Sequence, residues 1–196
     1  MKKIAIFGGA FNPPHIMHAA VVEALIRANF LDEIWVMPSG DRIDKNSSGV
    51  SKSDRVRMLN IMINELFPSP TIPIMVSELE VNRPTITRTT ETKNELEKLY
   101  PKERFYFVIG SDILSDIKTK WHNGEELFKS TNFILIPRGL DKLESDIARN
   151  IIVLDRSIRS SLSSTFIRNL LSQGYSGTPY ISNGVVEYIS KNKLYV

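Results

Sequence analysis

The chain has 196 residues, of which 42% are hydrophobic and 24% are charged, so it is long enough to bury the core of one ordinary domain. Its formal net charge of +3 suits an anionic ligand, but no long run of lysine and arginine indicates nucleic-acid binding. Because the chain contains no cysteine, disulfides, thiolate chemistry and cysteine-bound zinc are excluded.

The first residues superficially resemble a signal peptide. Their apolar run is short, contains Gly8 and Gly9, and ends in a Pro-Pro-His sequence without a small-residue cleavage site. No apolar stretch approaches the length of a membrane span. We therefore expect a cytoplasmic protein with no membrane partner.

Hydrophobic periodicity predicts strands and helices that alternate along the whole chain. The predicted strands are the apolar runs at 3–7, 33–37, 71–76, 104–109, 133–136 and 151–154. The predicted helices lie at 16–29, 52–67, 89–100, 164–173 and 182–191. This alternation favours an α/β fold with a parallel sheet, and we expect a single domain over residues 1–196 with a small helical C-terminal part.

A polar segment, residues 38–53, separates the second predicted strand from the following helix. Pro38, Gly40, Gly49 and five serines interrupt any regular pattern there. The segment is too short for a domain linker, so we interpret it as a mobile loop at the active site.

The segment after the first predicted strand carries the strongest chemical signal. It opens the first predicted helix and runs Gly8-Gly9-Ala10-Phe11-Asn12-Pro13-Pro14-His15-Ile16-Met17-His18. Parallel sheets bind ligands beyond the carboxyl ends of their strands, glycines let a backbone approach a phosphate closely, and helix N-termini favour anions. His15 and His18 are three residues apart, so they can point toward one ligand from the same helix face.

Other interpretations of this segment are weaker. It lacks the Gly-Lys-Ser/Thr of a Walker A loop and the third glycine of a dinucleotide fingerprint. A zinc site at His15 and His18 would need carboxylate ligands, because His122 is the only other histidine. The two histidines could also be capping or surface residues. We favour a functional role because a glycine pair and a proline pair precede them at a strand end.

A second pattern suited to phosphate lies near the other end of the chain and runs Ser163-Ser164-Thr165-Phe166-Ile167-Arg168. Ser164 can cap a helix whose free N–H groups face phosphate oxygens, and Arg168 lies one turn further along. Taken alone, Ser-Ser-Thr before a helix is usually only an N-cap. Together with the histidine segment, it strengthens the prediction of a phosphate site.

These two segments resemble the G-x-F-x-P-x-H-x-x-H and S-S-T-x-I-R signatures of the nucleotidylyltransferase superfamily. Within it, the chain most resembles nicotinate (or nicotinamide) mononucleotide adenylyltransferases, over nearly its whole length. The resemblance implies a Rossmann-like, doubly wound parallel sheet and the use of ATP and Mg²⁺. It also implies transfer of AMP to the phosphate of a pyridine mononucleotide, with release of pyrophosphate, in NAD biosynthesis.

The resemblance also assigns roles to individual residues. The catalytic residues would be His15, His18 and Arg168. The ATP-binding residues would be Gly8, Gly9, Ala10, Phe11, Lys45, Gly110, Asp112, Arg138, Ser163, Ser164 and Thr165. The mononucleotide-binding residues would be Asn12, Arg88, Thr89, Trp121 and His122. No protein ligand to a metal is expected, because the phosphates of ATP would hold most of the Mg²⁺ coordination.

Two of these assignments have simpler structural alternatives. Asp112 follows an apolar strand and Gly110, and by resemblance it would hold a ribose hydroxyl, although it could instead cap the next helix. Trp121 would stack on the pyridine ring, although a tryptophan is more often part of a core.

The chain departs from the family pattern near the expected mononucleotide site. Arg88 and His122 stand where tyrosines are common, and residues 42–45 replace a Pro-Pro-His-Lys sequence. In the histidine segment, Ala10 replaces a common threonine and Met17 a frequent glycine.

Two other functions therefore stay open: another nucleotidylyltransferase, such as one acting on a pantetheine phosphate, and a nucleotide-binding regulator without catalysis. The Trp121 region favours the pyridine enzyme, and the intact histidines and Arg168 argue against the regulator. A homo-oligomer is also left open.

Overall fold

The centre of the computed structural model is a six-stranded sheet in the order β3-β2-β1-β4-β5-β6. All five pairings between neighbouring strands are parallel. The strands are β1 Lys3–Gly9, β2 Glu33–Pro38, β3 Ile74–Val76, β4 Arg104–Gly110, β5 Asn132–Ile136 and β6 Ile151–Val153. The strand order reverses between β1 and β4, which makes this a Rossmann-like, doubly wound sheet. The structure describes residues 1–40, 50–137, 148–154, 158 and 160–196.

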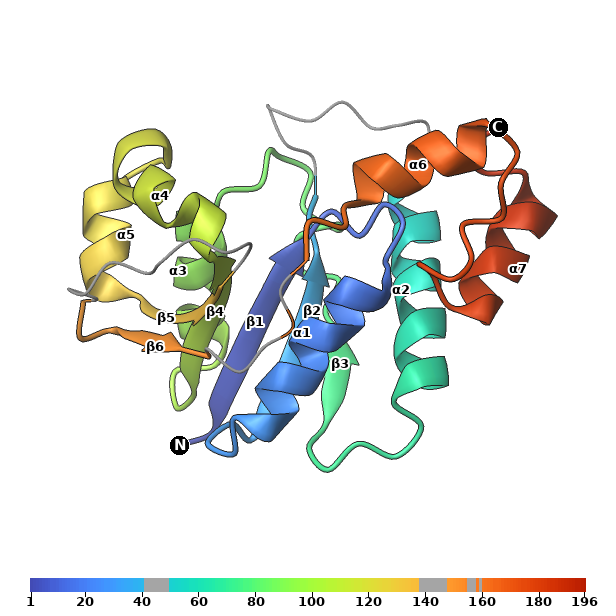
Figure 1. Cartoon of the computed structure of the whole chain (residues 1–196). Helices are drawn as coiled ribbons and strands as arrows, with labels where there is room; N and C mark the ends of the chain where they lie inside the picture. The colour runs from blue at the N-terminus through green and yellow to red at the C-terminus, as the bar shows by residue number, and fades with distance from the viewer. Residues whose placement is uncertain (41–49, 138–147, 155–157, 159) are drawn as a thin grey trace.

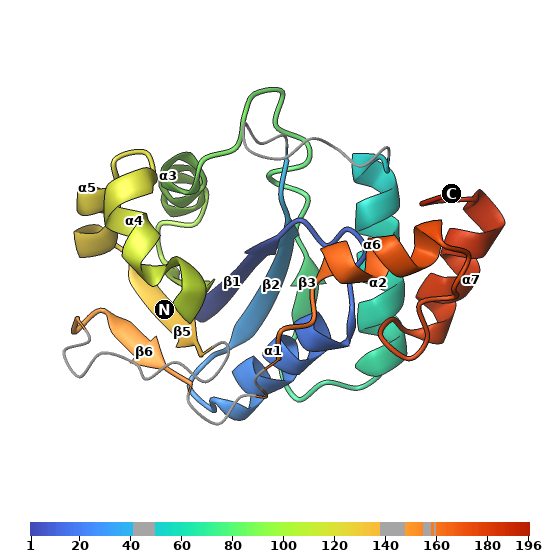
Figure 2. The same ribbon diagram turned by 45° about the horizontal axis from the view of Figure 1, so that its top comes forward.

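Helices cover both faces of this sheet (Figure 1). They are α1 Ile16–Arg27, α2 Lys52–Leu66, α3 Thr89–Leu99, α4 Leu114–Lys120, α5 Gly124–Ser130, α6 Ser164–Ser172 and α7 Asn183–Asn192, with a 3₁₀ turn η1 at Ser111–Ile113. Figures 1 and 2 show α1, α2, α6 and α7 on one side of the sheet and α3, α4 and α5 on the other.

The two faces of the sheet build two separate hydrophobic cores, because successive residues of a strand point in opposite directions. On β1, Ala5 and Phe7 belong to the core beneath α1, α2, α6 and α7. Ile4 and Ile6 belong to the core beneath α3, α4 and α5. A strand covered on both faces is apolar at most of its positions, which explains the continuous apolar runs that marked the strands in the sequence.

The predicted α/β fold with a parallel sheet is confirmed, and the predicted strands and helices agree with it closely. The predicted strand at 71–76 is shorter than expected, since β3 begins at Ile74, directly after Pro73. Two helices, α4 and α5, were not predicted. Each has seven residues, which is too short to repeat a helical period of apolar side chains convincingly.

The helical C-terminal part packs on the same core as α1 and α2. Ile167 of α6 and Ile189 of α7 are buried there. The side chain of Glu65, at the end of α2, accepts hydrogen bonds from the N–H groups of Asn183 and Gly184 at 3.1 and 2.9 Å. A carboxylate at this place satisfies the first N–H groups of α7 and fixes that helix against α2.

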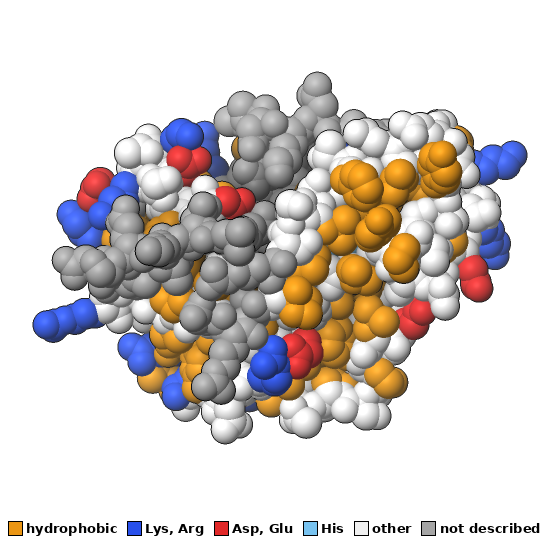
Figure 3. Space-filling view, in the orientation of Figure 1, with side chains coloured by type: hydrophobic (Ala, Val, Ile, Leu, Met, Phe, Trp, Pro, Cys, Tyr) orange, Lys and Arg blue, Asp and Glu red, His pale blue; other side chains and the backbone are white. Residues whose placement is uncertain are grey.

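Apolar side chains also gather on the outer surface of α6, α7 and α1 (Figure 3). Ile16 at the start of α1, Phe166 of α6 and Tyr175 beyond α6 are exposed. The ring of Phe166 packs edge-on against Tyr180, with 5.4 Å between ring centroids. Self-association of the chain stays a prediction. Within the described ranges, no helix is both long and apolar enough to cross a membrane.

The close packing of α4 against α5 depends on Gly124. A Cβ atom at this position would lie 1.9 Å from the carbonyl oxygen of Ile117. We expect Gly124→Ala to lower the free energy of unfolding by about 1–3 kcal/mol, because the two helices must separate. Urea unfolding measures the change. Ser115→Ala, at an exposed site on α4, is the control and should change stability by less than about 0.5 kcal/mol. Equal stability of both variants would contradict the prediction.

Candidate active site

The candidate site lies at the carboxyl ends of β1 and β4, where the order of the sheet reverses. From β1 the chain leads into α1 on one face, and from β4 it leads through η1 into α4 on the other (Figure 2). This is the position at which open parallel sheets bind their ligands. In the described part of the chain, no heavy atom beyond Gly8 and its two chain neighbours lies within 4 Å of where a Cβ at Gly8 would stand. A ligand can therefore approach the backbone there.

Phe11 shapes the loop between β1 and α1. Its φ of 47° lies in the left-handed region, and its side chain is only 1% exposed. The ring packs edge-on against Phe7 and His18, with centroids 5.4 and 4.8 Å away. A Cβ at Gly9 would approach this ring to 3.0 Å. The packing of Phe11 thus favours glycine at position 9 and compensates for an unfavourable backbone conformation.

His15 and His18 lie together, as the sequence predicts. Their rings stack with centroids 3.7 Å apart. The backbone N–H of His15 donates to Nδ1 of His18 at 3.1 Å. Because a neutral imidazole has one donor and one acceptor nitrogen, the proton of His18 then sits on Nε2. His18 is therefore oriented to donate a hydrogen bond through the far edge of its ring.

The start of α6 reaches the same loop. Nη1 of Arg168 donates to the carbonyl oxygen of Asn12 at 2.9 Å, and Nη2 donates to Oγ1 of Thr165 at 3.1 Å. The hydroxyl of Ser164 donates to the carbonyl oxygen of Pro13 at 2.9 Å. These bonds join the serine-rich start of α6 to the loop before the histidines. The sequence related these two segments only through their resemblance to one family's signatures.

The capping role expected for Ser164 is wrong by one residue. Ser163 is the N-cap of α6, and its side chain accepts from the N–H of Phe166 at 3.3 Å. Ser164 occupies the first helical position, so its hydroxyl is available for the bond to Pro13. The helix N-terminus still faces the loop, which keeps the proposed anion-binding geometry.

Arg55 of α2 is a site residue that the sequence analysis missed. Its guanidinium is buried and donates to the carbonyl oxygens of Ala10 and Ser39, at 2.8 and 2.7 Å. It thereby ties the loop after β1 to the end of β2. A signal was present in the sequence, because Arg55 shares the buried face of its helix with Leu59 and Met62. A charged residue on such a face needs buried partners.

Tyr195, beyond the end of α7, is a second missed residue. Its hydroxyl donates a short hydrogen bond to Oδ1 of Asn12. Burial raises the pKa of the Tyr195 phenol well above its ordinary value of 10.0, although the charges of Arg168 and Arg55 act in the opposite direction. No spacing in the sequence could connect residue 195 with residue 12.

Four of the five residues assigned to the mononucleotide lie on two neighbouring segments, and the fifth, Asn12, lies in the loop after β1. The hydroxyl of Thr90, at the start of α3, donates to the carbonyl oxygen of His122 at 2.9 Å. Arg88 and Thr89 directly precede Thr90, and Trp121 directly precedes His122. The bond therefore holds these two parts of the chain near each other in space. Trp121 is half-buried and packs against the core beneath α3, α4 and α5. Arg88 forms an exposed ion pair with Glu91 at 3.3 Å, a contact that contributes little to stability.

Asp112 lies just beyond β4, inside the η1 turn, and is exposed. The N-cap of η1 is Gly110 and that of α4 is Ile113, so the alternative that Asp112 caps the next helix is wrong. Its carboxylate stands instead at the carboxyl end of the sheet. Two other assigned residues, Lys45 and Arg138, lie outside the described residues, as do residues 41–44 and 46–49 of the loop at 38–53.

The side chains around the loop suit phosphate better than a metal ion. They supply imidazole, guanidinium and hydroxyl donors, from His15, His18, Arg168 and Thr165. Among the described residues, no group of three or more His, Cys, Asp or Glu side chains is placed to hold a metal ion. The arrangement can bind and neutralise an extended anion.

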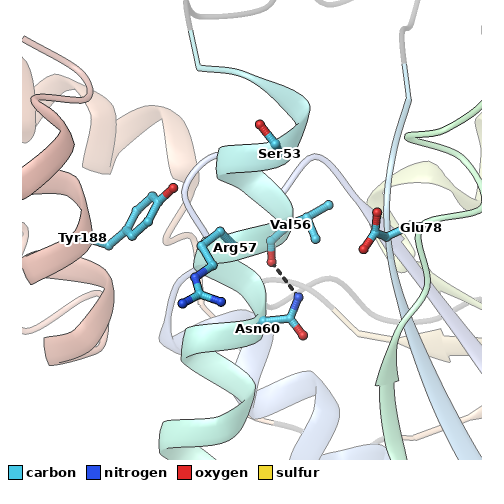
Figure 4. Close-up of a pocket in the computed structure, with 6 residues that line it drawn as sticks. All are labelled: Ser53, Val56, Arg57, Asn60, Glu78 and Tyr188. Atoms are coloured by element: carbon cyan, nitrogen blue, oxygen red, sulfur yellow. Dashed lines mark hydrogen bonds between the residues drawn. The ribbon is translucent and has the colours of Figure 1, made fainter.

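A cavity of about 490 Å³ lies elsewhere, along α2 (Figure 4). Figure 4 shows Tyr188 and Glu78 on opposite sides of this helix. The cavity is lined by Ser53, Val56, Arg57, Asn60, Glu78 and Tyr188. Polar groups here are engaged within the fold, since Tyr188 donates to Asp54 and Asn60 donates to the carbonyl of Val56. None of the assigned site residues lines this cavity.

The fold and the strand-end loop define the class of nucleotidyltransferases that have a Rossmann-like sheet. A family model described as cytidylyltransferase-like matches residues 6–170 of the chain. This stretch contains the histidine segment, β4 with Asp112, and the start of α6 with Arg168.

Similar proteins narrow the class. The chain is 31% identical to the probable nicotinate-nucleotide adenylyltransferase of Oceanobacillus iheyensis, over 100% of this chain and 97% of that protein. It is also 31% identical to the protein of that name from Caldicellulosiruptor bescii, over 98% of each. Among solved structures, the Plasmodium falciparum nicotinic acid mononucleotide adenylyltransferase complexed with NaAD superimposes with a TM-score of 0.84 at 29% identity. That match covers 100% of this chain and 98% of the other. The chain therefore belongs to the cytidylyltransferase-like family and, within it, to the nicotinate-nucleotide adenylyltransferases.

The structural role of Arg55 can be tested by measuring the free energy of unfolding, without an activity assay. Arg55→Met removes the guanidinium and leaves the carbonyl groups of Ala10 and Ser39 without this donor. We expect the free energy of unfolding to fall by about 2–4 kcal/mol, measured by chemical denaturation. Arg57→Met, on the exposed side of the same helix, is the matched control and should change it by less than about 0.5 kcal/mol. Similar losses in the two variants would show that Arg55 has no special structural role.

Proposed function

We propose that this chain transfers AMP from ATP to nicotinate mononucleotide, forming the dinucleotide and pyrophosphate in NAD biosynthesis. The observation that carries the proposal is the convergence of His15, His18 and Arg168 on one strand-end loop. This convergence occurs in a chain whose relatives, over nearly their full length, are named nicotinate-nucleotide adenylyltransferases. A second related structure from Plasmodium falciparum, complexed with APC, superimposes with a TM-score of 0.81.

The reaction is an in-line displacement at phosphorus. An oxygen of the mononucleotide phosphate forms a bond to the α-phosphorus of ATP while the bond from that phosphorus to the pyrophosphate oxygen breaks. Such chemistry depends on positioning and on charge neutralisation more than on a nucleophilic side chain. The site supplies donors and cations in place of a nucleophile, which fits this requirement.

His18 has the most direct chemical role in the proposal. Because Nδ1 accepts from the backbone N–H of His15, Nε2 carries the proton, and this N–H would stabilise charge that develops on the α-phosphate oxygens. His15 and Arg168 would hold the departing pyrophosphate, together with the N–H groups at the start of α6. Gly8, Gly9, Ala10 and Phe11 would provide the backbone surface on which the phosphates lie.

Mg²⁺ enters this proposal with the substrate, as the complex with ATP. The side chains at the loop are suited to phosphate oxygens, so the phosphates themselves would hold the ion. When bound, Mg²⁺ neutralises phosphate charge and favours the departure of pyrophosphate. Lys45 and Arg138 are proposed as further cations for ATP, and Asp112 as the acceptor for a ribose hydroxyl.

The mononucleotide would bind on the α3–α5 side of the site. Trp121 offers a flat face for the pyridine ring, beside His122 and the Arg88–Thr89 pair. The charge of Arg88 would attract the carboxylate of nicotinate, and Asn12 would contact the same substrate from the loop. Neither nucleic acid nor membrane is proposed as a partner, and the cytoplasmic location stays a prediction.

The decisive assay follows pyrophosphate release from ATP and Mg²⁺ with three acceptors in turn: nicotinate mononucleotide, nicotinamide mononucleotide and phosphopantetheine. We expect fast release with nicotinate mononucleotide and slower release with its amide, since Arg88 favours a carboxylate. Release with phosphopantetheine alone would indicate a different substrate. ATP binding without release for any acceptor would indicate a nucleotide-binding regulator.

Substitutions of His18 separate its two nitrogen atoms. His18→Asn can still accept from the N–H of His15 but has no group at the position of Nε2, whereas His18→Gln can place an amide N–H there. We expect kcat to fall about 100-fold or more in His18→Ala and His18→Asn, with ATP affinity changed much less, and to recover partly in His18→Gln. Steady-state kinetics and ATP titration measure both quantities. An unchanged kcat in His18→Asn would refute the assignment.

A further inference from the structure

We propose that Tyr195 is a positioning residue for the mononucleotide, because its hydrogen bond to Asn12 orients the side-chain amide of that residue toward the substrate. Asn12 lies in the loop that carries both histidines and is linked to Arg168 through its carbonyl oxygen. The inference rests on the proposed function, and it assigns a task to a residue far from both phosphate signatures.

The hydrogen bond selects one orientation of the Asn12 amide. Its Oδ1 accepts from the hydroxyl of Tyr195, so the Nδ2 group lies at the opposite edge of the amide. This edge presents N–H donors, which suit the oxygen acceptors of an anionic mononucleotide. With the amide reversed, Oδ1 would face the same anion and repel it. The tyrosine hydroxyl thus favours the orientation in which Asn12 attracts the substrate.

The chain after α7 is held firmly enough to do this. Lys193 and Tyr195 both have positive φ angles, of 50° and 67°, which is unusual for residues with side chains. The N–H of Leu194 donates to the carbonyl of Ile189 at 3.1 Å, and the side chain of Leu194 packs against the core beneath α1, α2, α6 and α7. Such a backbone conformation persists only where the surrounding structure imposes it.

The surroundings of the phenol keep it a donor. Burial raises the pKa of Tyr195, with Asp54 acting in the same direction and Arg168 and Arg55 against it. The hydroxyl therefore retains its proton over the whole pH range in which the enzyme would be assayed. The orientation of Asn12 should accordingly not depend on pH.

The test compares two tyrosines of the same C-terminal region. Tyr195→Phe keeps the ring and removes the hydrogen bond to Asn12, whereas Tyr188→Phe removes a hydrogen bond of 2.8 Å to Asp54 on α2. We expect Tyr195→Phe to raise KM for the mononucleotide about three- to tenfold and to leave KM for ATP within about twofold. Tyr188→Phe should leave both constants unchanged.

Two further measurements separate positioning from a general structural effect. In the Asn12→Ala background, Tyr195→Phe should have no further effect on KM, because the group through which it acts is absent. In ¹⁵N-labelled protein, the side-chain NH₂ signals of Asn12, assigned by their loss in Asn12→Ser, should move in Tyr195→Phe and stay in place in Tyr188→Phe.

Unmoved Asn12 signals in Tyr195→Phe, or equal increases of KM for both substrates, would overturn the inference. A failure of the proposed function looks different. In that case the unaltered chain releases no pyrophosphate with either pyridine mononucleotide, while the NMR comparison still reports whether Tyr195 orients Asn12.

Discussion

The backbone of residues 10–13, which we propose as the phosphate site, is held in place by side chains from later elements that donate to its carbonyl groups. A loop beyond a strand end has no ladder partners, and carbonyl groups withdrawn from water must find donors elsewhere. Arg55 supplies one for Ala10, Arg168 for Asn12 and Ser164 for Pro13. The position of the two histidines thus depends on the packing of α2 and α6 on the core that they share with α1 and α7.

The two hydrophobic cores lie on opposite faces of the sheet, and each of them positions one half of the proposed site. The histidines and Arg168 stand on helices that pack on one face of the sheet, and Trp121 stands on the connection between two helices of the other face. Each half is positioned by its own apolar packing. The shared element is the pair β1 and β4, whose parallel register runs from Lys3 opposite Arg104 to Ile6 opposite Phe107.

The fold was predictable because a sheet buried on both faces leaves an unmistakable pattern of apolar runs. The two segments that we propose to bind phosphate were also predictable, because their glycine, histidine and serine residues lie close together in the sequence at a strand end or a helix start. Arg55 gave a weaker signal, a charge on an apolar helix face, and Tyr195 gave none. Its contact with Asn12 joins positions 183 residues apart, and only the complete packing of the chain can specify such a pair. The helices α4 and α5 were not predicted because each is too short to show a helical repeat of apolar residues.

The long sequence separations of these contacts have a consequence for the newly made chain. The bonds from Ser164, Arg168 and Tyr195 to the loop span 151, 156 and 183 residues. During synthesis the histidines emerge early, whereas Ser164, Arg168 and Tyr195 emerge last. Domains generally fold as units as they leave the ribosome. A nascent chain that still lacks α6 and α7 therefore holds His15 and His18 in a loop with only part of its support, and we expect its enzymatic competence to begin only when translation is nearly finished.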